Sequence, residues 1–521
     1  MKYFCMFFLN LLLAATSFGA NFEDDVQKLY EAENFAQKEA VIKELGVGYK
    51  GDEKLSLLLS QMLEGNLYKS ANAIVYQQNG KNIDIVTGEI VEGSESEKIT
   101  INNRLRTVLR AELIAVNLSS KDTAVRIKAA KELLGNLEEK DTALIKDTLQ
   151  KEESKKVKAI LAECLAILNA RFQTGSEQLS AINELGGYLS PQSLQTLNEL
   201  GSGENHPYKA QIEASIKNIK DAAKFYSIIE TLFFGLSTGS ILLLAAMGLA
   251  ITFGVMKVIN MAHGELIMIG AYTAYTIQQL LPNLIEYSII IAIPIAFFVS
   301  GAVGILIERL ILRHLYTRPL EALLATFGVS LILQQLVRTF YSAQNRDVKT
   351  PEWLSGSFEI NSLLSITYNR FYILIFSLLI FAFAILLLKK TSLGLRVRAL
   401  SQNRAMAQAM GIKTSLIDAL TFGIGSGVAG VAGVALSQLT NVGPNLGQAY
   451  IVDSFMVVVF GGVGNLWGTL IGAFSLGELN KILETFSGAM IAKILILVFV
   501  ILFIQKRPRG LFPQKGRDAE D

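Results

Sequence analysis

Long apolar runs fill residues 225–504, and this feature limits the fold more than any other. The whole chain is only 18% charged, whereas soluble proteins carry about 25% charged residues. A membrane-spanning helix needs about 20 mainly apolar residues. Seven runs are candidate spans: 228–252, 266–281, 289–311, 323–341, 371–388, 416–439 and 491–504. We therefore predict an all-α, polytopic membrane domain.

An eighth apolar stretch, residues 451–483, is interrupted by glycines. It is too long for one span and too short for two comfortable ones, so we expect two short helices or a re-entrant pair. Gly461, Gly462 and Gly464 form the interruption. Broken backbone at membrane depth is tolerated only where protein buries it or where it lines a cavity.

Positive charge predicts the orientation. The loop 389–413 contains six Lys or Arg residues and no acid, and the loop around Arg313 and the tail after 504 are also basic. Such loops face the cytoplasm, which places the start of the first span outside. An outside N-terminal domain and an inside tail require an odd number of crossings. Seven crossings with a re-entrant element, or nine, satisfy this requirement.

The first 20 residues have the pattern of a secretory signal. Lys2 precedes an apolar core at 4–15, and small residues favour cleavage near Gly19 or Ala20. An uncleaved anchor is the alternative, but the run is shorter than a span. Residues 21–224 are then expected outside the cytoplasm.

Residues 21–224 are charged and mostly amphipathic helix. Apolar blocks beginning at Val125 and Val157 lie 32 residues apart, which favours HEAT-type repeats and an ordinary helical bundle about equally. Residues 83–91, with Gly88, predict one short hairpin. Cys164 lies in an apolar helical stretch, so we expect a buried side chain rather than a reactive thiol. A docking or scaffold role is our prediction for this segment.

A few polar residues lie within or beside the spans. A buried polar group must be paired or face a cavity, so these residues are candidates for the solute path. They are Asn260, His263, Glu265, Gln334, Gln335 and Gln438. For His263 and Glu265 a simple helix start is an equal alternative, because a carboxylate is stabilised at a helix N-terminus.

The residues expected for nucleic-acid binding, metal binding, catalysis or nucleotide binding are missing from the sequence. The net charge of +2 argues against a nucleic-acid partner. With three histidines in the chain, no metal set or nucleophile–base pair is expected. There is also no glycine-rich phosphate loop. We therefore expect neither an enzyme nor a bound cofactor, and ATP that drives transport would bind to partner subunits.

Four segments together resemble the branched-chain amino acid ABC permease family. Residues 248–272, GLAITFGVMKVINMAHGELIMIGAY, resemble its signature, and 396–412 resemble its ATPase-docking segment. Residues 457–472 and 507–512 also fit. The resemblance covers nearly all of 225–515.

This resemblance implies a complex in the bacterial inner membrane. The partners would be a second permease subunit, two ATPase subunits, a periplasmic solute-binding protein and the lipid bilayer. The chain would comprise a signal peptide (1–20), a periplasmic domain (21–224), a permease domain (225–515) and a cytoplasmic tail (516–521). The docking segment would include Arg396, Arg398, Arg404 and Gly411. A topology signal alone is the alternative for this loop, but its apolar residues favour docking.

Within the family, the secreted extension resembles that of the urea-type permease subunit. Residues 318–335 and 345–354 resemble that subgroup too. The resemblance implies transport of urea or short amides. A branched-chain amino acid permease is the alternative. A membrane receptor is an alternative of another class, but it would need a cytoplasmic effector domain, and only a short tail follows the last span.

Overall fold

A computed structural model describes residues 22–70, 73–78, 81–91, 96–203, 206–256, 258–316 and 318–512. The chain divides into two compact units, Met1–Ala222 and Ala223–Asp521, which we call the soluble unit and the membrane unit. The boundary falls inside one helix, α11 (Lys209–Met256). The predicted signal peptide and the tail 516–521 lie outside the described residues.

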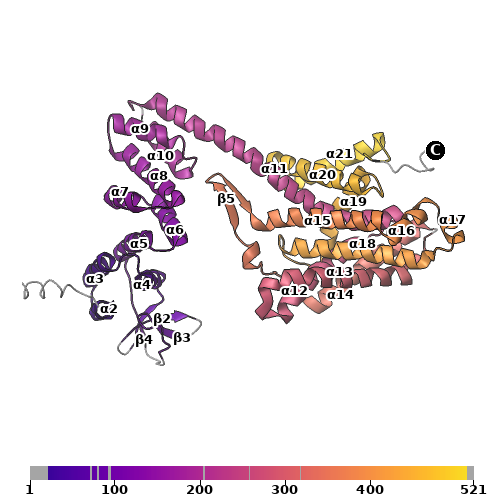
Figure 1. Ribbon diagram of the computed structural model, residues 1–521, viewed down its shortest axis with the longest axis horizontal. Helices are drawn as coiled ribbons and strands as arrows, with labels where there is room; N and C mark the ends of the chain where they lie inside the picture. Colours follow the sequence, from indigo (N-terminus) through magenta and orange to yellow (C-terminus); the bar gives the residue numbers. More distant parts are fainter. Residues whose placement is uncertain are drawn as a thin grey trace, which may run out of the picture. The chain divides into compact units, whose positions relative to one another are not determined.

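The soluble unit is mainly helical (Figure 1). Polar caps begin several of its helices; Asn34, for example, forms a capping box with Gln37 at the start of α3. The helices are α2 (Phe22–Glu31), α3 (Phe35–Gly48), α4 (Glu53–Glu64), α5 (Asn103–Leu118), α6 (Thr123–Gly135), α7 (Thr142–Lys151), α8 (Lys155–Phe172), α9 (Ser176–Leu185) and α10 (Pro191–Gly201).

A four-stranded antiparallel sheet lies between α4 and α5 in the sequence. Its order is β3-β2-β1-β4, with β1 (Leu67–Ser70), β2 (Ala73–Gln78), β3 (Lys81–Asp84) and β4 (Ser96–Lys98). The predicted hairpin at 83–91 is present: Ile83 and Ile90 form an antiparallel bridge, and the Asp84 amide donates to the Glu89 carbonyl at 2.9 Å. Its first strand, β3, also pairs with β2, so the hairpin is part of a larger sheet that the sequence did not predict. The sheet escaped detection because its strands are short and carry polar residues such as Lys69 and Gln77.

The amphipathic helices bury the faces that their periodicity predicts. Leu133 of α6 and Val157, Leu161 and Cys164 of α8 share one hydrophobic core. Cys164 is fully buried, as expected. The HEAT-type repeat itself stays a prediction.

The membrane unit is a set of long helices that lie roughly side by side (Figure 1). After α11 they are α12 (His263–Leu280), α13 (Ile285–Leu310), α14 (Pro319–Tyr341), α15 (Tyr368–Lys390), α16 (Ser392–Gln402), α17 (Arg404–Ala409), α18 (Thr414–Ser437), α19 (Leu446–Gly461), α20 (Leu466–Ser487) and α21 (Ala489–Lys506). A hairpin of β5 (Ser357–Asn361) and β6 (Leu364–Thr367), which the sequence did not predict, precedes α15.

Within the described residues, six helices are long and apolar enough to cross a membrane. They belong to α11, α13, α14, α15, α18 and α21, and the bent pair α19–α20 raises the number to as many as seven. The predicted span 266–281 is helical, as α12, but it is more polar and is not among the six. The polytopic all-α class is confirmed, and the odd number of crossings stays a prediction.

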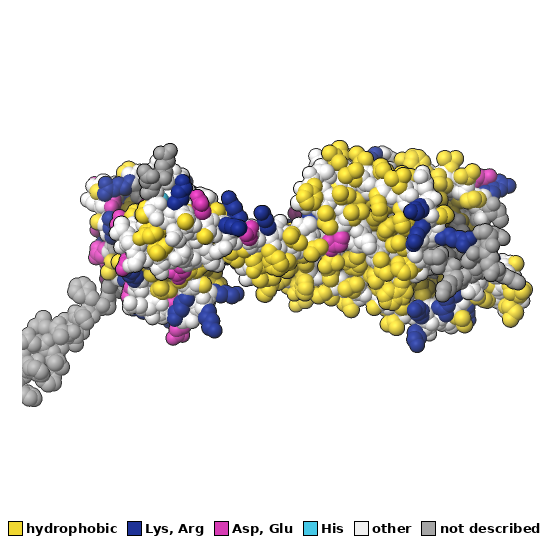
Figure 2. All heavy atoms as spheres, turned by 90° about the horizontal axis from the view of Figure 1, so that it is seen from above, with side chains coloured by type: hydrophobic (Ala, Val, Ile, Leu, Met, Phe, Trp, Pro, Cys, Tyr) yellow, Lys and Arg dark blue, Asp and Glu magenta, His cyan; other side chains and the backbone are white. Residues whose placement is uncertain are grey.

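The most deeply buried helix, α18, packs through glycines. A side chain at Gly270 of α12 would collide with the backbone of Gly430, and one at Gly427 would meet Phe297 of α13. Gly239 of α11 and Gly477 of α20 are in similar contact. The four-residue glycine spacing therefore serves close helix packing, as predicted. Figure 2 shows the outcome at the surface: hydrophobic side chains cover most of the visible face of the membrane unit, and charged ones are mixed over the soluble unit.

Candidate transport path and docking segment

The predicted break at the glycines is real: α19 and α20 meet at a bend of 120°. Gly462 has φ +107°, a conformation that other residues rarely adopt. Asn465 then caps α20 by accepting from the amides of Trp467 (3.1 Å) and Gly468 (3.3 Å). The broken element is therefore a built turn with its own cap.

The segment after α21 holds this turn in place. The Leu511 amide donates to the Phe460 carbonyl (2.9 Å), and the Phe512 amide donates to that of Gly461 (3.1 Å). Asn465 returns a hydrogen bond to the Phe512 carbonyl (3.3 Å). The broken element and the segment 507–512, which are separate motifs in the sequence, thus form one structure. Hydrogen bonds within the protein satisfy the backbone groups that the break leaves free.

Glu265 and Gln334 come together as a buried polar cluster between α12 and α14. One carboxylate oxygen of Glu265 accepts from Gln334 Nε2 (2.7 Å) and Ser330 Oγ (2.9 Å). Ser330 and Gln334 are four residues apart and so share a helix face. Gln335 lies one position further round α14 and is exposed. The structure therefore separates the two predicted glutamines.

The remaining predicted path residues have local contacts. His263 is fully buried, and its Nε2 lies 2.9 Å from the Ala245 carbonyl of α11. The buried Asn260 side chain accepts from the Ala262 amide (3.0 Å) just before α12. Both residues thus support the start of α12. Gln438 is buried at the end of α18, where its backbone carbonyl accepts from Asn369 Nδ2 (2.8 Å).

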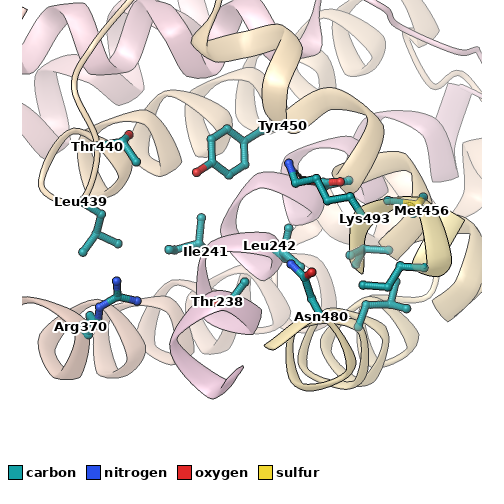
Figure 3. A pocket seen from close by; sticks show the side chains of 14 residues that line it. Thr238, Ile241, Leu242, Arg370, Leu439, Thr440, Tyr450, Met456, Asn480 and Lys493 are labelled. Atoms are coloured by element: carbon teal, nitrogen blue, oxygen red, sulfur yellow. Dashed lines mark ion pairs between the residues drawn. The ribbon is translucent and has the colours of Figure 1, made fainter. Parts of the chain in front are cut away.

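A cavity of about 220 Å³ lies near this end of α18 (Figure 3). Its wall contains aliphatic residues such as Ile241 and Leu242. Polar and charged groups also reach it: Thr238, Arg370, Thr440, Tyr450, Asp453, Asn480 and Lys493. None of these was predicted. The signal was present, because Asp453 and Lys493 are ionisable residues inside apolar runs, and such residues commonly mark solute paths.

The charges in this cavity are partly neutralised by neighbours. Lys493 of α21 pairs with Asp453 of α19 at 3.4 Å. Figure 3 shows Arg370 and Lys493 on opposite sides of the cavity. The Arg370 guanidinium lies 4.8 Å from the centre of the Phe234 ring, which stabilises a cation. The cavity thus offers hydrogen-bond donors, acceptors and an aliphatic surface to a small solute.

The predicted docking segment forms α16 and α17. Its inner face is apolar, with Val397, Leu400 and Ala407 packed against Ile417. Its outer face exposes Leu395 (63%), Met406 (60%) and Met410 (76%).

The predicted docking residues do not all point outward. Arg396 and Gly411 are exposed. Arg398 is also exposed but donates to the Leu388 carbonyl. Arg404 pairs with the fully buried Asp418 of α18.

A second cavity, of about 690 Å³, adjoins this segment. Gly464 of the broken element lines it, together with Lys389, Arg398 and Arg509. The broken element therefore packs against the segment after α21 and also borders this cavity.

Comparison with known proteins identifies the family. Residues 231–504 match the family described as branched-chain amino acid transport system / permease component. The chain belongs to this permease family. It is 31% identical to the permease protein LivH of Salmonella typhimurium over 299 residues, which are 55% of this chain and 96% of LivH. No solved structure matches the chain.

The relatives are named for more than one solute. BraD of Pseudomonas aeruginosa, a high-affinity branched-chain amino acid permease, is 29% identical over 299 residues, 55% of this chain and 96% of BraD. The ribose import permease RbsC of Haemophilus influenzae is 33% identical over 135 residues, 24% of this chain and 42% of RbsC. The chain is thus an ABC permease subunit rather than an enzyme. It is a multi-pass inner-membrane protein of a complex with ATPase and other subunits.

Proposed function

We propose that this chain forms the transmembrane path for urea or short amides in an ATP-driven importer. The observation that carries the proposal is the additional soluble unit. The family match begins at residue 231, whereas the soluble unit precedes Ala223. A secreted extension of this kind is the feature by which the sequence resembles the urea-type subunit.

The names of the relatives do not decide the substrate. The amino acid permease LivH is 31% identical to this chain over 299 residues, and the ribose permease RbsC is 33% identical over 135 residues. Proteins similar to this chain are therefore named for chemically different solutes. A neutral solute such as urea can use the donors and acceptors of the first cavity, including Thr238, Asn480 and Asp453.

Uptake of radiolabelled urea tests the proposal. A strain that lacks this gene should lose high-affinity urea uptake at micromolar concentration, and the intact gene should restore it. L-leucine uptake in the same strains is the matched control. Urea uptake that is unchanged by the deletion would refute the substrate.

Import of aliphatic amino acids is the second candidate. The relatives LivH and BraD are named for it. The first cavity favours it as well, because Arg370 suits a carboxylate, Asp453 suits an ammonium group, and aliphatic residues lie beside them. Loss of leucine uptake with normal urea uptake in the deletion strain would select this candidate.

We further propose that the soluble unit is periplasmic after removal of the signal peptide, and that the C-terminus is cytoplasmic. Alkaline phosphatase fused after residue 224 should be active, and the same enzyme fused at residue 521 should be inactive. Green fluorescent protein at the same two positions should give the opposite pattern. Active phosphatase at the C-terminus would overturn the orientation.

For the complex, we propose a second permease, two ATPases and a periplasmic binding protein as partners. Arg396→Glu with Arg398→Glu places negative charge on the exposed side of α16. It should abolish co-purification of the ATPases while the chain still inserts in the membrane. Normal co-purification would contradict docking at this segment.

A further inference from the structure

An ion pair joins the docking segment to the interior of the membrane unit. Arg404, at the start of α17, pairs through its guanidinium with the Asp418 carboxylate of α18. The Asp418 side chain is fully buried, and that of Arg404 is 39% exposed. A buried carboxylate depends strongly on its partner cation, because water cannot replace it. Arg404 therefore fixes the position of α17 against α18.

Tyr316 extends this link to α13. The Arg404 guanidinium lies 4.8 Å from the centre of the Tyr316 ring. The Tyr316 hydroxyl donates to Glu308 Oε1 at 2.5 Å, and the Glu308 side chain is 1% exposed. The next residue, Arg309, donates to Ser415 Oγ of α18 at 3.0 Å. The docking segment is thus tied by charged and polar groups to two helices.

The helix that carries Asp418 also leads to the first cavity. α18 has 24 residues, which corresponds to a length of about 36 Å, enough to cross the hydrocarbon core. Nearly all of it is buried, and close glycine contacts hold it against α12 and α13. The cavity-lining residues Leu439 and Thr440 lie two and three residues after its end. Displacement of α17 would therefore move a rigid element whose other end borders the cavity.

We infer that the Arg404–Asp418 pair transmits movement of the docked ATPase to α18 and so couples ATP hydrolysis to opening of the solute path. The inference rests on the proposed importer function. It separates two tasks within one segment. Leu395, Arg396, Met406 and Met410 face outward and bind the partner, while Arg404 faces inward and positions α18.

Coupling is measured as solute transported per ATP hydrolysed by the complete complex in proteoliposomes. In complexes that retain both ATPases, Arg404→Gln should still hydrolyse ATP but lower this ratio at least tenfold. Arg404→Lys, which keeps the charge, should recover part of it. A structural role alone would not produce hydrolysis without transport in a fully assembled complex.

Arg396→Gln is the matched control, because it removes an exposed arginine from the same segment. It should weaken ATPase association while the assembled complexes keep the normal ratio. The double variant Arg404→Gln with Asp418→Asn leaves no unpaired buried charge. If Arg404→Gln alone fails to assemble, the same ratio is measured for the double variant. A double variant that hydrolyses ATP but transports at least tenfold less solute per ATP supports the inference.

Two results overturn the inference. One is a normal ratio in an assembled complex that carries Arg404→Gln, alone or with Asp418→Asn. The other is a loss of transport that is fully explained by loss of the ATPase subunits from the complex. Failure of the substrate proposal is recognised separately. If the wild-type complex does not transport urea, that proposal fails, and the same ratio is measured with L-leucine.

Discussion

The soluble unit and the membrane unit are both mainly helical, but different groups hold their helices together. In the soluble unit, large aliphatic side chains such as Leu109 and Leu161 fill the cores. In the membrane unit, glycines let helices approach so closely that a side chain would collide with the neighbouring backbone, as at Gly270 and Gly430. Water drives apolar side chains together, whereas lipid provides no such force, so helices in lipid depend on close backbone packing. One chain thus shows how the solvent selects the packing residue.

Enlargement of a packing glycine should disrupt the membrane unit as a whole. In Gly430→Leu the new side chain would meet Ser300 and the Ala296 carbonyl of α13. Overpacking costs about 1–3 kcal/mol, and contact with fixed backbone should bring the cost to the upper end or beyond. We expect loss of the monodisperse peak in size-exclusion chromatography. Gly328→Leu on α14, where a Cβ meets nothing within 4 Å, is the control and should elute normally.

Truncation of a soluble core residue should have an effect that is confined to the soluble unit. Leu161 is fully buried, and Leu161→Ala should cost about 2–5 kcal/mol through lost burial and a cavity. Hydrogen exchange should accelerate in the soluble unit and stay unchanged in α18. Val47→Ala, at a position 74% exposed, should change stability by less than about 0.5 kcal/mol. Equal acceleration in both units would contradict their independence.

The same contrast explains what the sequence could predict. Long apolar runs, the glycine spacing and the glycine break each correspond to an observed element, because a membrane limits the choice to helices. The sheet around β1 and β2 was not predicted, since in water short strands with Lys69 and Gln77 can be stabilised by tertiary packing alone. Lipid restricts the possible folds more than water does, so the membrane unit was easier to predict than the soluble unit.

Single positions were harder to interpret than segments. Glu265 and Gln334 do meet, but Gln335 lies on another face of α14, a difference that one residue of helical rotation creates. Arg404 looked equivalent to Arg396 in a basic loop. Its inward direction depends on Asp418, fourteen residues further along the chain, and only the folded structure shows this pairing.

Glu163 should make the soluble unit sensitive to pH. Burial raises the pKa of its carboxyl above the usual 4.5, although Ser193 donates a hydrogen bond to it at 2.8 Å. The folded state then binds more protons than the unfolded state, so stability should fall as pH rises above 4.5, by at most about 1.4 kcal/mol per unit. Glu163→Gln should remove this slope in denaturation of the purified chain at pH 4.5 to 7.

Glu152 provides the control of opposite sign. Its pKa is lowered, because bonds from Arg126 and the Ser154 amide outweigh the opposing effect of burial. Its contribution to stability is present above pH 4.5 and is lost on acidification. Glu152→Gln should therefore destabilise the unit at neutral pH and leave the slope from Glu163 in place. An unchanged slope in Glu163→Gln would show that another group causes it.

The smallest effect concerns Cys164. Burial raises the pKa of its thiol to about 12, and the reactive form is the thiolate. A maleimide should therefore leave Cys164 unmodified in the folded chain and label it after denaturation, which mass spectrometry of the peptide 155–172 can measure. Leu161→Ala should raise the labelling rate, since Leu161 packs in the same core, and Gly430→Leu should not. Labelling that rises in both variants would mean that disruption of the membrane unit reaches the soluble core, and that the two kinds of packing are not independent.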